Sequence, residues 1–181
     1  MATHKRKLMN INRLITYRKG LRVERFHTVP HITSYSNGHH SANAALIAHD
    51  LCLLNDIDSK DLIIYMLMHD VAEQYVGDVP ANAKIDNPYL KEAMGVAETY
   101  WEGQYLPNVP GLSKQEACLA RVSDLAELGM YCLEELDMGN SNVLPTIDKV
   151  VEYLLPISEL GFAGVHELMM HIKLGGEHYV S

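Results

Sequence analysis

Apolar residues recur at intervals of three and four positions along most of the chain, a pattern typical of amphipathic helices. The segment 40–54 carries one such stripe, which we expect to be a buried helix face. Its members are Ala44, Ile47, Leu51 and Leu54. The alternation typical of strands is almost absent. Helical patterning covers residues of about 7–19, 40–54, 61–75, 89–106, 113–139 and 143–155, and a stretch after Leu160.

Several residues indicate where these helices begin and end. Ser113 followed by Glu116 is typical of a capping box, and Gly139 is typical of a helix end. Together these patterns predict an all-α fold, with residues 1–181 forming a single domain because neither repeats nor low-complexity linkers interrupt them.

The segment 61–75 is apolar nearly all round, so we expect it to form one helix in the centre of the fold. Asp56 or Ser59 can cap its beginning. Residues 77–88 contain Gly, Pro and Asn and are expected to form a loop.

The 181 residues carry a formal charge of −8, distributed unevenly. Residues 1–25 contain eight basic residues and one acid, whereas the rest contains seven basic and 22 acidic residues. The basic segment could bind a polyanion or act as a transit peptide, but it lacks serine. We favour a first helix with a solvated basic face.

The composition also limits where the chain can act. Three widely spaced cysteines without a CxxC motif indicate a reducing compartment. No apolar run is long enough for a membrane span. We therefore expect a cytoplasmic protein.

Three places put ionisable groups where apolar residues are expected. The pair His69-Asp70 follows an apolar run, His40 opens one helix, and Asp124 lies within another. Each alone is more often a solvated or hydrogen-bonded residue, and for the pair a helix end facing water is an equal alternative. Together, imidazoles and carboxylates from three helices are typical of a divalent transition-metal site.

The order H…HD…D resembles the signature of the HD-domain metal-dependent phosphohydrolases, a helical fold. Further motifs over residues 21–140 resemble the bacterial 5′-deoxynucleotidases and the small phage dATP triphosphohydrolases. These motifs are RVERF (22–26), HHSANAALIAH (39–49), HDVAEQYVGDVPANAK (69–84), VSDLAEL (122–128) and CLEEL (132–136).

The resemblance implies a role for each matching position. The metal ligands are His40, His69, Asp70 and Asp124, and they hold one divalent ion (Co, Mn, Zn or Mg). The catalytic carboxylate acting on the attacking water is Glu73, and Asp78 lies at the sugar and the attacked phosphate. The phosphate-binding residues are Arg25, Lys84 and Arg121.

Phe26 replaces the usual Trp of the family, and His39 replaces the usual Glu. These departures affect the expected base preference and local charge rather than the metal site. Phe26, Thr28 and Val79 are candidates for lining the base pocket, although each is more often plain core.

Three functions remain open from the sequence. We favour hydrolysis of dATP, or another dNTP, to deoxynucleoside and triphosphate, because the chain is short and the loop before Asp124 is trimmed. The alternative is a 5′-deoxynucleotidase acting on deoxynucleoside monophosphates. A non-catalytic nucleotide- or nucleic-acid-binding HD protein would have lost a ligand or Glu73, and neither is missing. The resemblance further implies a homo-oligomer, a dimer or hexamer, in a bacterium or in a phage-infected host. We expect neither a membrane nor a nucleic acid as a partner.

Overall fold

The computed structural model describes residues 10–106 and 109–178. Lys5, Arg6 and Lys7 of the basic N-terminal segment lie outside the described residues. The described part is helical, which confirms the all-α prediction, and its one isolated β-bridge joins Glu24 to Ser36. The helices are α1 (Ile11–Gly20), α2 (Asn37–Leu54), α3 (Lys60–Met68), α4 (Glu73–Val76), α5 (Ala81–Asp86), α6 (Pro88–Tyr105), α7 (Lys114–Asp137), the 3-10 helix η1 (Ser141–Val143), α8 (Leu144–Ser158) and α9 (Val165–Glu177). None of these helices is both long and apolar enough to cross a membrane.

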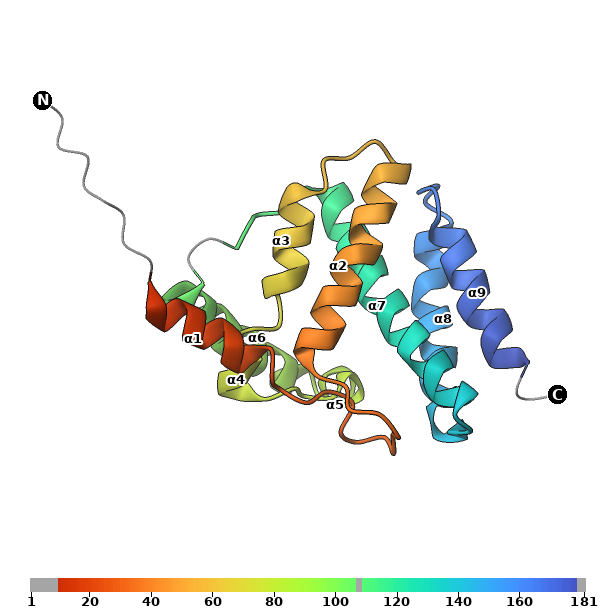
Figure 1. Ribbon diagram of the computed structural model, residues 1–181, viewed down its shortest axis with the longest axis horizontal. Coiled ribbons are helices and arrows are strands. Elements are labelled where there is room, and N and C mark those ends of the chain that lie inside the picture. The colour runs from red at the N-terminus through yellow and green to blue at the C-terminus, as the bar shows by residue number, and fades with distance from the viewer. Residues whose placement is uncertain (1–9, 107–108, 179–181) are drawn as a thin grey trace, which may run out of the picture.

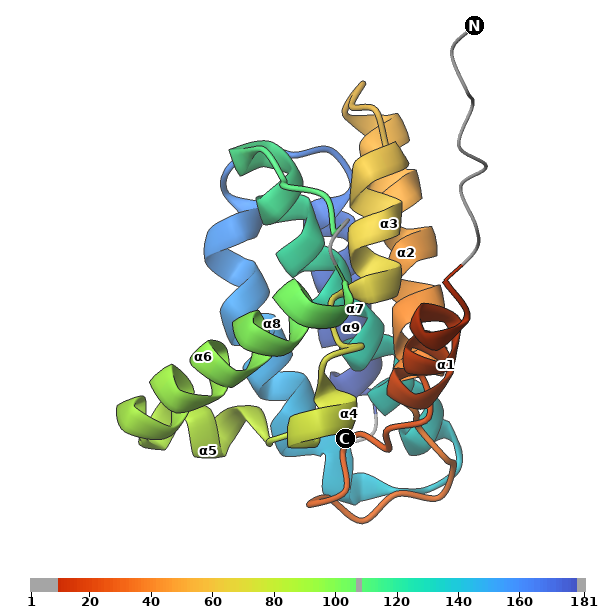
Figure 2. The same ribbon diagram turned by 90° about the vertical axis from the view of Figure 1, so that its left-hand side faces the viewer.

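The core lies between α2 and α7, which pack against each other in the middle of the molecule (Figure 1). Ala44, Ala48 and Ala126 are fully buried there, and such small side chains allow two helices to approach closely. Helix α3 covers the other side of α2, and α8 and α9 pack against α7. The pair α5 and α6 extends to one side of this bundle (Figure 2).

Two predictions about burial were wrong. Leu54, at the end of the expected stripe, is 59% exposed because it lies on the last turn of α2. Helix α3 is not central, since only Leu62 and Met66 of it are buried and Leu67 is 43% exposed. Helix α3 has apolar residues on more of its surface than its packing on α2 can cover.

The predicted helix 61–75 is interrupted. Helix α3 ends at Met68, a turn follows, and α4 begins at Glu73. Helix α1 presses on this turn, because a Cβ added to Gly20 would lie 2.6 Å from the Val71 carbonyl oxygen. The Gln74 side chain also donates a hydrogen bond to the Thr16 carbonyl at 3.1 Å. Helix α1 is therefore packed closely against the turn between α3 and α4.

The predicted capping box is present: Ser113 accepts from the Glu116 amide, and Glu116 accepts from the Ser113 amide. At α3, neither expected side chain caps the helix; Asp58 accepts a hydrogen bond from the Lys60 amide instead.

The expected loop 77–88 contains the short helix α5. Helix α2 begins at Asn37, before the expected start, because Ser36 caps it by accepting from the His39 amide.

Glu135 of α7 anchors the long loop that leads into α2. Its fully buried carboxylate accepts hydrogen bonds from the amides of Ile32 (2.7 Å) and Thr33 (2.8 Å), and from the Asn140 side chain (2.8 Å). Burial opposes ionisation, but the hydrogen bonds from Thr33 and Asn140 outweigh it and lower the pKa of Glu135 to about 2. The loop is therefore tied to the same helix that carries Asp124.

We expect Glu135→Gln to lower the free energy of unfolding by about 2 kcal/mol at pH 7, because buried amide donors lose an acceptor. The folded-state pKa of Glu135 lies below its ordinary value, so this stabilisation is complete above about pH 4.5 and is lost as the pH falls toward 2. Urea unfolding at pH 7 and at pH 3 should show that the difference in the free energy of unfolding between wild type and Glu135→Gln is smaller at pH 3. The exposed neighbour Glu134→Gln is the matched control, and equal effects of the two substitutions would contradict the prediction.

Candidate metal centre and active site

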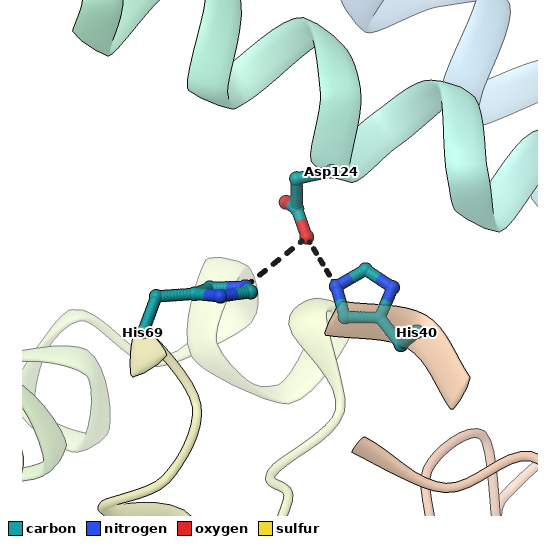
Figure 3. Close-up of side chains that lie close together, drawn as sticks. All are labelled: His40, His69 and Asp124. Atoms are coloured by element: carbon teal, nitrogen blue, oxygen red, sulfur yellow. Dashed lines mark ion pairs between the residues drawn. The ribbon is translucent and has the colours of Figure 1, made fainter. Parts of the chain in front are cut away.

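Three side chains from three parts of the fold converge at one point (Figure 3). His40 lies near the start of α2, His69 directly follows α3, and Asp124 lies on α7. The Asp124 Oδ1 is 3.0 Å from the His40 Nε2 and 3.9 Å from the His69 Nε2. One ligand atom from each residue lies within 4.8 Å of the others, a spacing that a single metal ion can bridge.

The two imidazoles are suited to such an ion. The Nε2 atoms of His40 and His69 are buried, and neither has a hydrogen-bond partner among the described residues. Buried polar atoms are nearly always paired in proteins. Two unpaired nitrogens that face one carboxylate therefore indicate a site where all three groups can bind the same metal ion. Imidazole nitrogen and carboxylate oxygen are ordinary ligands of divalent transition metals.

Asp70 borders the same point. Its Oδ2 lies 3.2 Å from the His69 Nε2 and 3.8 Å from the His40 Nε2, and it also forms an ion pair with Arg25. The four predicted ligands therefore gather in one place. Arg25 shares the Asp70 oxygen that faces the imidazoles.

The site requires positive charge. Burial alone would lower the pKa of His69, but the charges of Asp70 and of the neighbouring Asp124 raise it well above its ordinary value. Burial would likewise raise the pKa of Asp124, yet the neighbouring His40 and His69 hold it well below its ordinary range. Ionised carboxylates at this depth are stable only beside cations, and a divalent ion would satisfy them.

The opposite edge of each imidazole is also occupied. The His40 Nδ1 lies 2.5 Å from the Glu127 Oε2, and the His69 Nδ1 lies 2.8 Å from the Met66 carbonyl oxygen. An acceptor at Nδ1 fixes the tautomer that leaves the Nε2 lone pair free for a metal. Glu127 was absent from the predicted site, although its position three residues after Asp124 places both on one helix face.

Glu73 lies at the start of α4 and is 6% exposed. The Asn37 side-chain amide donates to the Glu73 Oε2 at 2.8 Å, and Arg25 lies 3.9 Å from the same oxygen. Burial and the charge of Asp70 raise the pKa of Glu73 to about 8. Asn37 also donates to the Asp70 carbonyl and accepts from Arg25, so this residue, which was not predicted, links three site residues.

Phe26 and Asp78 lie together on the loop side of the site. The Phe26 amide donates to the Asp78 Oδ2 at 3.3 Å, and the His27 Nδ1 is 3.8 Å from that oxygen. Phe26 has a φ of 60°, a conformation that a bulky side chain adopts at an energetic cost and that is concentrated at functional sites. Its ring packs edge-on against Tyr131 at a centroid distance of 5.8 Å.

Arg121 and Lys84 are the two other residues that were predicted to bind phosphate. The Arg121 Nη1 is 3.2 Å from the Asp124 Oδ2, and its guanidinium lies 5.8 Å from the centre of the Tyr153 ring. Burial raises the pKa of Glu98, and the positive charge of nearby Lys84 opposes this rise.

Val79 is partly buried and follows Asp78 directly. Thr28 is exposed on the loop after Phe26, and none of the hydrogen bonds found within residues 10–106 and 109–178 joins it to the site. His39 is exposed and contacts the Tyr35 ring rather than the metal ligands.

Comparison with known proteins agrees with this arrangement. The family model "5′-deoxynucleotidase YfbR-like" matches residues 21–163. A 5′-deoxynucleotidase of Vibrio vulnificus is 25% identical over 138 residues, which cover 65% of this chain and 71% of that protein. A 5′-deoxynucleotidase of Vibrio atlanticus is 23% identical over the same shares.

Two solved structures share the fold. A protein of Pyrococcus horikoshii superimposes with a TM-score of 0.72 at 21% identity, covering 93% of this chain and 99% of that one. The HD phosphohydrolase DatZ of cyanophage S-2L, bound to dA and one catalytic Zn²⁺ ion, has a TM-score of 0.61 at 15% identity over 95% and 96% of the two chains. The match over residues 21–163 shows that the chain, a deoxynucleotide phosphohydrolase, belongs to the YfbR-like 5′-deoxynucleotidase family of HD-domain proteins.

Proposed function

We propose that the protein is a metal-dependent 5′-deoxynucleotidase, which hydrolyses deoxynucleoside monophosphates to deoxynucleoside and phosphate. The observation that supports metal dependence best is the pair of buried, unpaired Nε2 atoms of His40 and His69 facing Asp124. The curated relatives are 5′-deoxynucleotidases, so they favour the monophosphate over the dATP substrate that the sequence analysis favoured.

In this proposal the four residues His40, His69, Asp70 and Asp124 hold one divalent ion. A bound ion lowers the pKa of coordinated water and neutralises charge on a phosphoryl oxygen. The donor set of imidazoles and carboxylates suits Zn²⁺, Mn²⁺ or Co²⁺ better than Mg²⁺, which prefers oxygen ligands.

Glu73 is the proposed general base. Its carboxylate lies beside Asp70 and is oriented by Asn37, so it can accept a proton from the attacking water. Arg25 is the proposed phosphate ligand, since its guanidinium already faces the site and can exchange Asp70 for phosphate oxygens. The ester bond to the sugar oxygen breaks as the water oxygen bonds to phosphorus, and the departing oxygen takes up the proton that Glu73 accepted from the water.

Further residues would surround the substrate. Asp78 is held by the Phe26 amide at the loop side, where it can accept a hydrogen bond from the sugar. Phe26 provides an apolar wall for sugar or base. Lys84 and Arg121 supply positive charge at the margin, and Arg121 also contacts the ligand Asp124.

We expect dAMP or another deoxynucleoside monophosphate, supplied with Mn²⁺, Co²⁺ or Zn²⁺, to yield free phosphate, and EDTA to abolish turnover. Anion-exchange chromatography separates this product from the triphosphate that dATP would release. Release of triphosphate from dATP without cleavage of any monophosphate would contradict the proposed substrate and support the triphosphohydrolase. No turnover of either substrate class would contradict the enzyme itself.

We expect Glu73→Gln to keep the metal and lower kcat by a factor of about 10² to 10⁴, because the amide cannot accept the proton. Elemental analysis after dialysis measures whether the metal is kept. Steady-state kinetics with one substrate measure the fall in kcat. In Asp124→Asn the metal content itself should fall. Glu92→Gln on the exposed side of α6 is the control for loss of one acidic charge. A Glu73→Gln variant with wild-type kcat would show that this carboxylate is not the base.

A further inference from the structure

Glu127 is a buried carboxylate that the proposed chemistry does not use. Its side chain is 4% exposed and accepts hydrogen bonds from the Tyr35 hydroxyl and from the His40 Nδ1, the latter at 2.5 Å. It lies at the edge of the His40 ring opposite the Nε2, so it is one residue removed from the metal position. Burying an ionised carboxylate is costly unless it is paired, so its presence here requires a physical reason.

Glu127 and Asp124 hold one imidazole between them. They are three residues apart on α7 and therefore share a helix face. Asp124 lies 3.0 Å from the His40 Nε2, while Glu127 lies 2.5 Å from the Nδ1 of the same ring. The ring is fully buried, and any rotation would break one of the two contacts.

Tyr35 fixes the other side of the Glu127 carboxylate. Its ring is 1% exposed and stacks on Tyr131 at a centroid distance of 3.9 Å and an interplanar angle of 6°. The Tyr131 hydroxyl is in turn 3.1 Å from the Thr33 carbonyl and 3.3 Å from the Glu135 carboxylate. The ring of Tyr35 is thus held in position by packing on α7, and its hydroxyl also lies 3.1 Å from the His40 Nδ1.

We propose that Glu127 and Tyr35 are positioning residues that set the metal affinity of the site through His40. The inference rests on the metal site in the proposed function. A carboxylate accepting the Nδ1–H of a ligand histidine fixes its orientation and tautomer and makes the Nε2 a stronger donor. Tyr35 holds this carboxylate in place by donating to it.

The two ligand histidines differ in this respect. The His69 Nδ1 faces the neutral Met66 carbonyl oxygen at 2.8 Å, whereas the His40 Nδ1 faces an anion. A neutral acceptor orients the ring, but an anionic acceptor also supports the positive charge that coordination places on it. His40 is therefore the ligand whose strength depends most on its outer partner.

The test measures metal binding directly, with the metal-free full chain and Zn²⁺ or Co²⁺ as the probe. Affinity is obtained by competition with a chelator, and visible absorption of the Co²⁺ form reports the ligand field. We expect affinity to fall by about 10- to 100-fold in Glu127→Ala and by less in Glu127→Gln, whose amide oxygen still accepts from Nδ1–H. Tyr35→Phe keeps the ring stack and should weaken binding about tenfold, at the lower end of outer-partner effects. The exposed Glu134→Gln on the same helix is the control and should bind as wild type.

Urea unfolding of the metal-free variants separates positioning from stability. A purely structural role would lower the free energy of unfolding but leave the affinity and the Co²⁺ spectrum of the folded protein unchanged, and this result would overturn the inference. If Glu127→Ala does not fold, Glu127→Gln and Tyr35→Phe decide in the same way. Wild-type protein that binds neither metal would overturn the proposed function together with the inference, whereas normal wild-type binding with unaffected variants would overturn the inference alone.

Discussion

The structure depends on a concentration of buried charge where α2, the end of α3 and α7 meet. Asp124 and Asp70 are held below their ordinary pKa values by the two histidines, and Arg25 adds a further positive charge. Buried carboxylates without cations would be protonated or would destabilise the fold. The arrangement is therefore stable because imidazoles, a guanidinium and a metal ion can share these oxygens. In the proposed function the same carboxylates hold a divalent ion, and this ion attracts the negatively charged phosphate of the substrate.

Around this centre the fold provides rigid support rather than further chemistry. The Glu135 carboxylate ties the loop before α2 to α7, and the stacked rings of Tyr35 and Tyr131 continue that connection toward His40. On the other side, the close approach of Gly20 to Val71 fixes the turn that presents His69 and Asp70. The segments that carry His40, His69 and Asp70 are thus each packed against another part of the fold. Such preorganisation limits the reorganisation needed when metal and substrate bind.

The sequence predicts the parts of this arrangement that follow from local patterns. The helical fold follows from apolar periodicity, and the convergence of His40, His69 and Asp124 follows from the order of the HD motif. The break after Met68 was not predictable, because it depends on a contact with α1 some 50 residues earlier in the chain.

The outer partners of the ligands were also missed. Tyr35 lies on a loop and Asn37 lies at the start of α2, and the geometry of both depends on long-range contacts. Glu127 could have been found from its spacing to Asp124, but a mid-helix glutamate is usually solvated.

The central claim is that two imidazoles and two carboxylates hold the metal, and X-ray absorption spectroscopy of the Zn²⁺-loaded protein tests it most directly. The account predicts a first shell containing the two imidazole nitrogens of His40 and His69 with the remaining ligands oxygen, and removal of one imidazole contribution in His69→Ala. A first shell of sulfur ligands, or of oxygen alone, would contradict it.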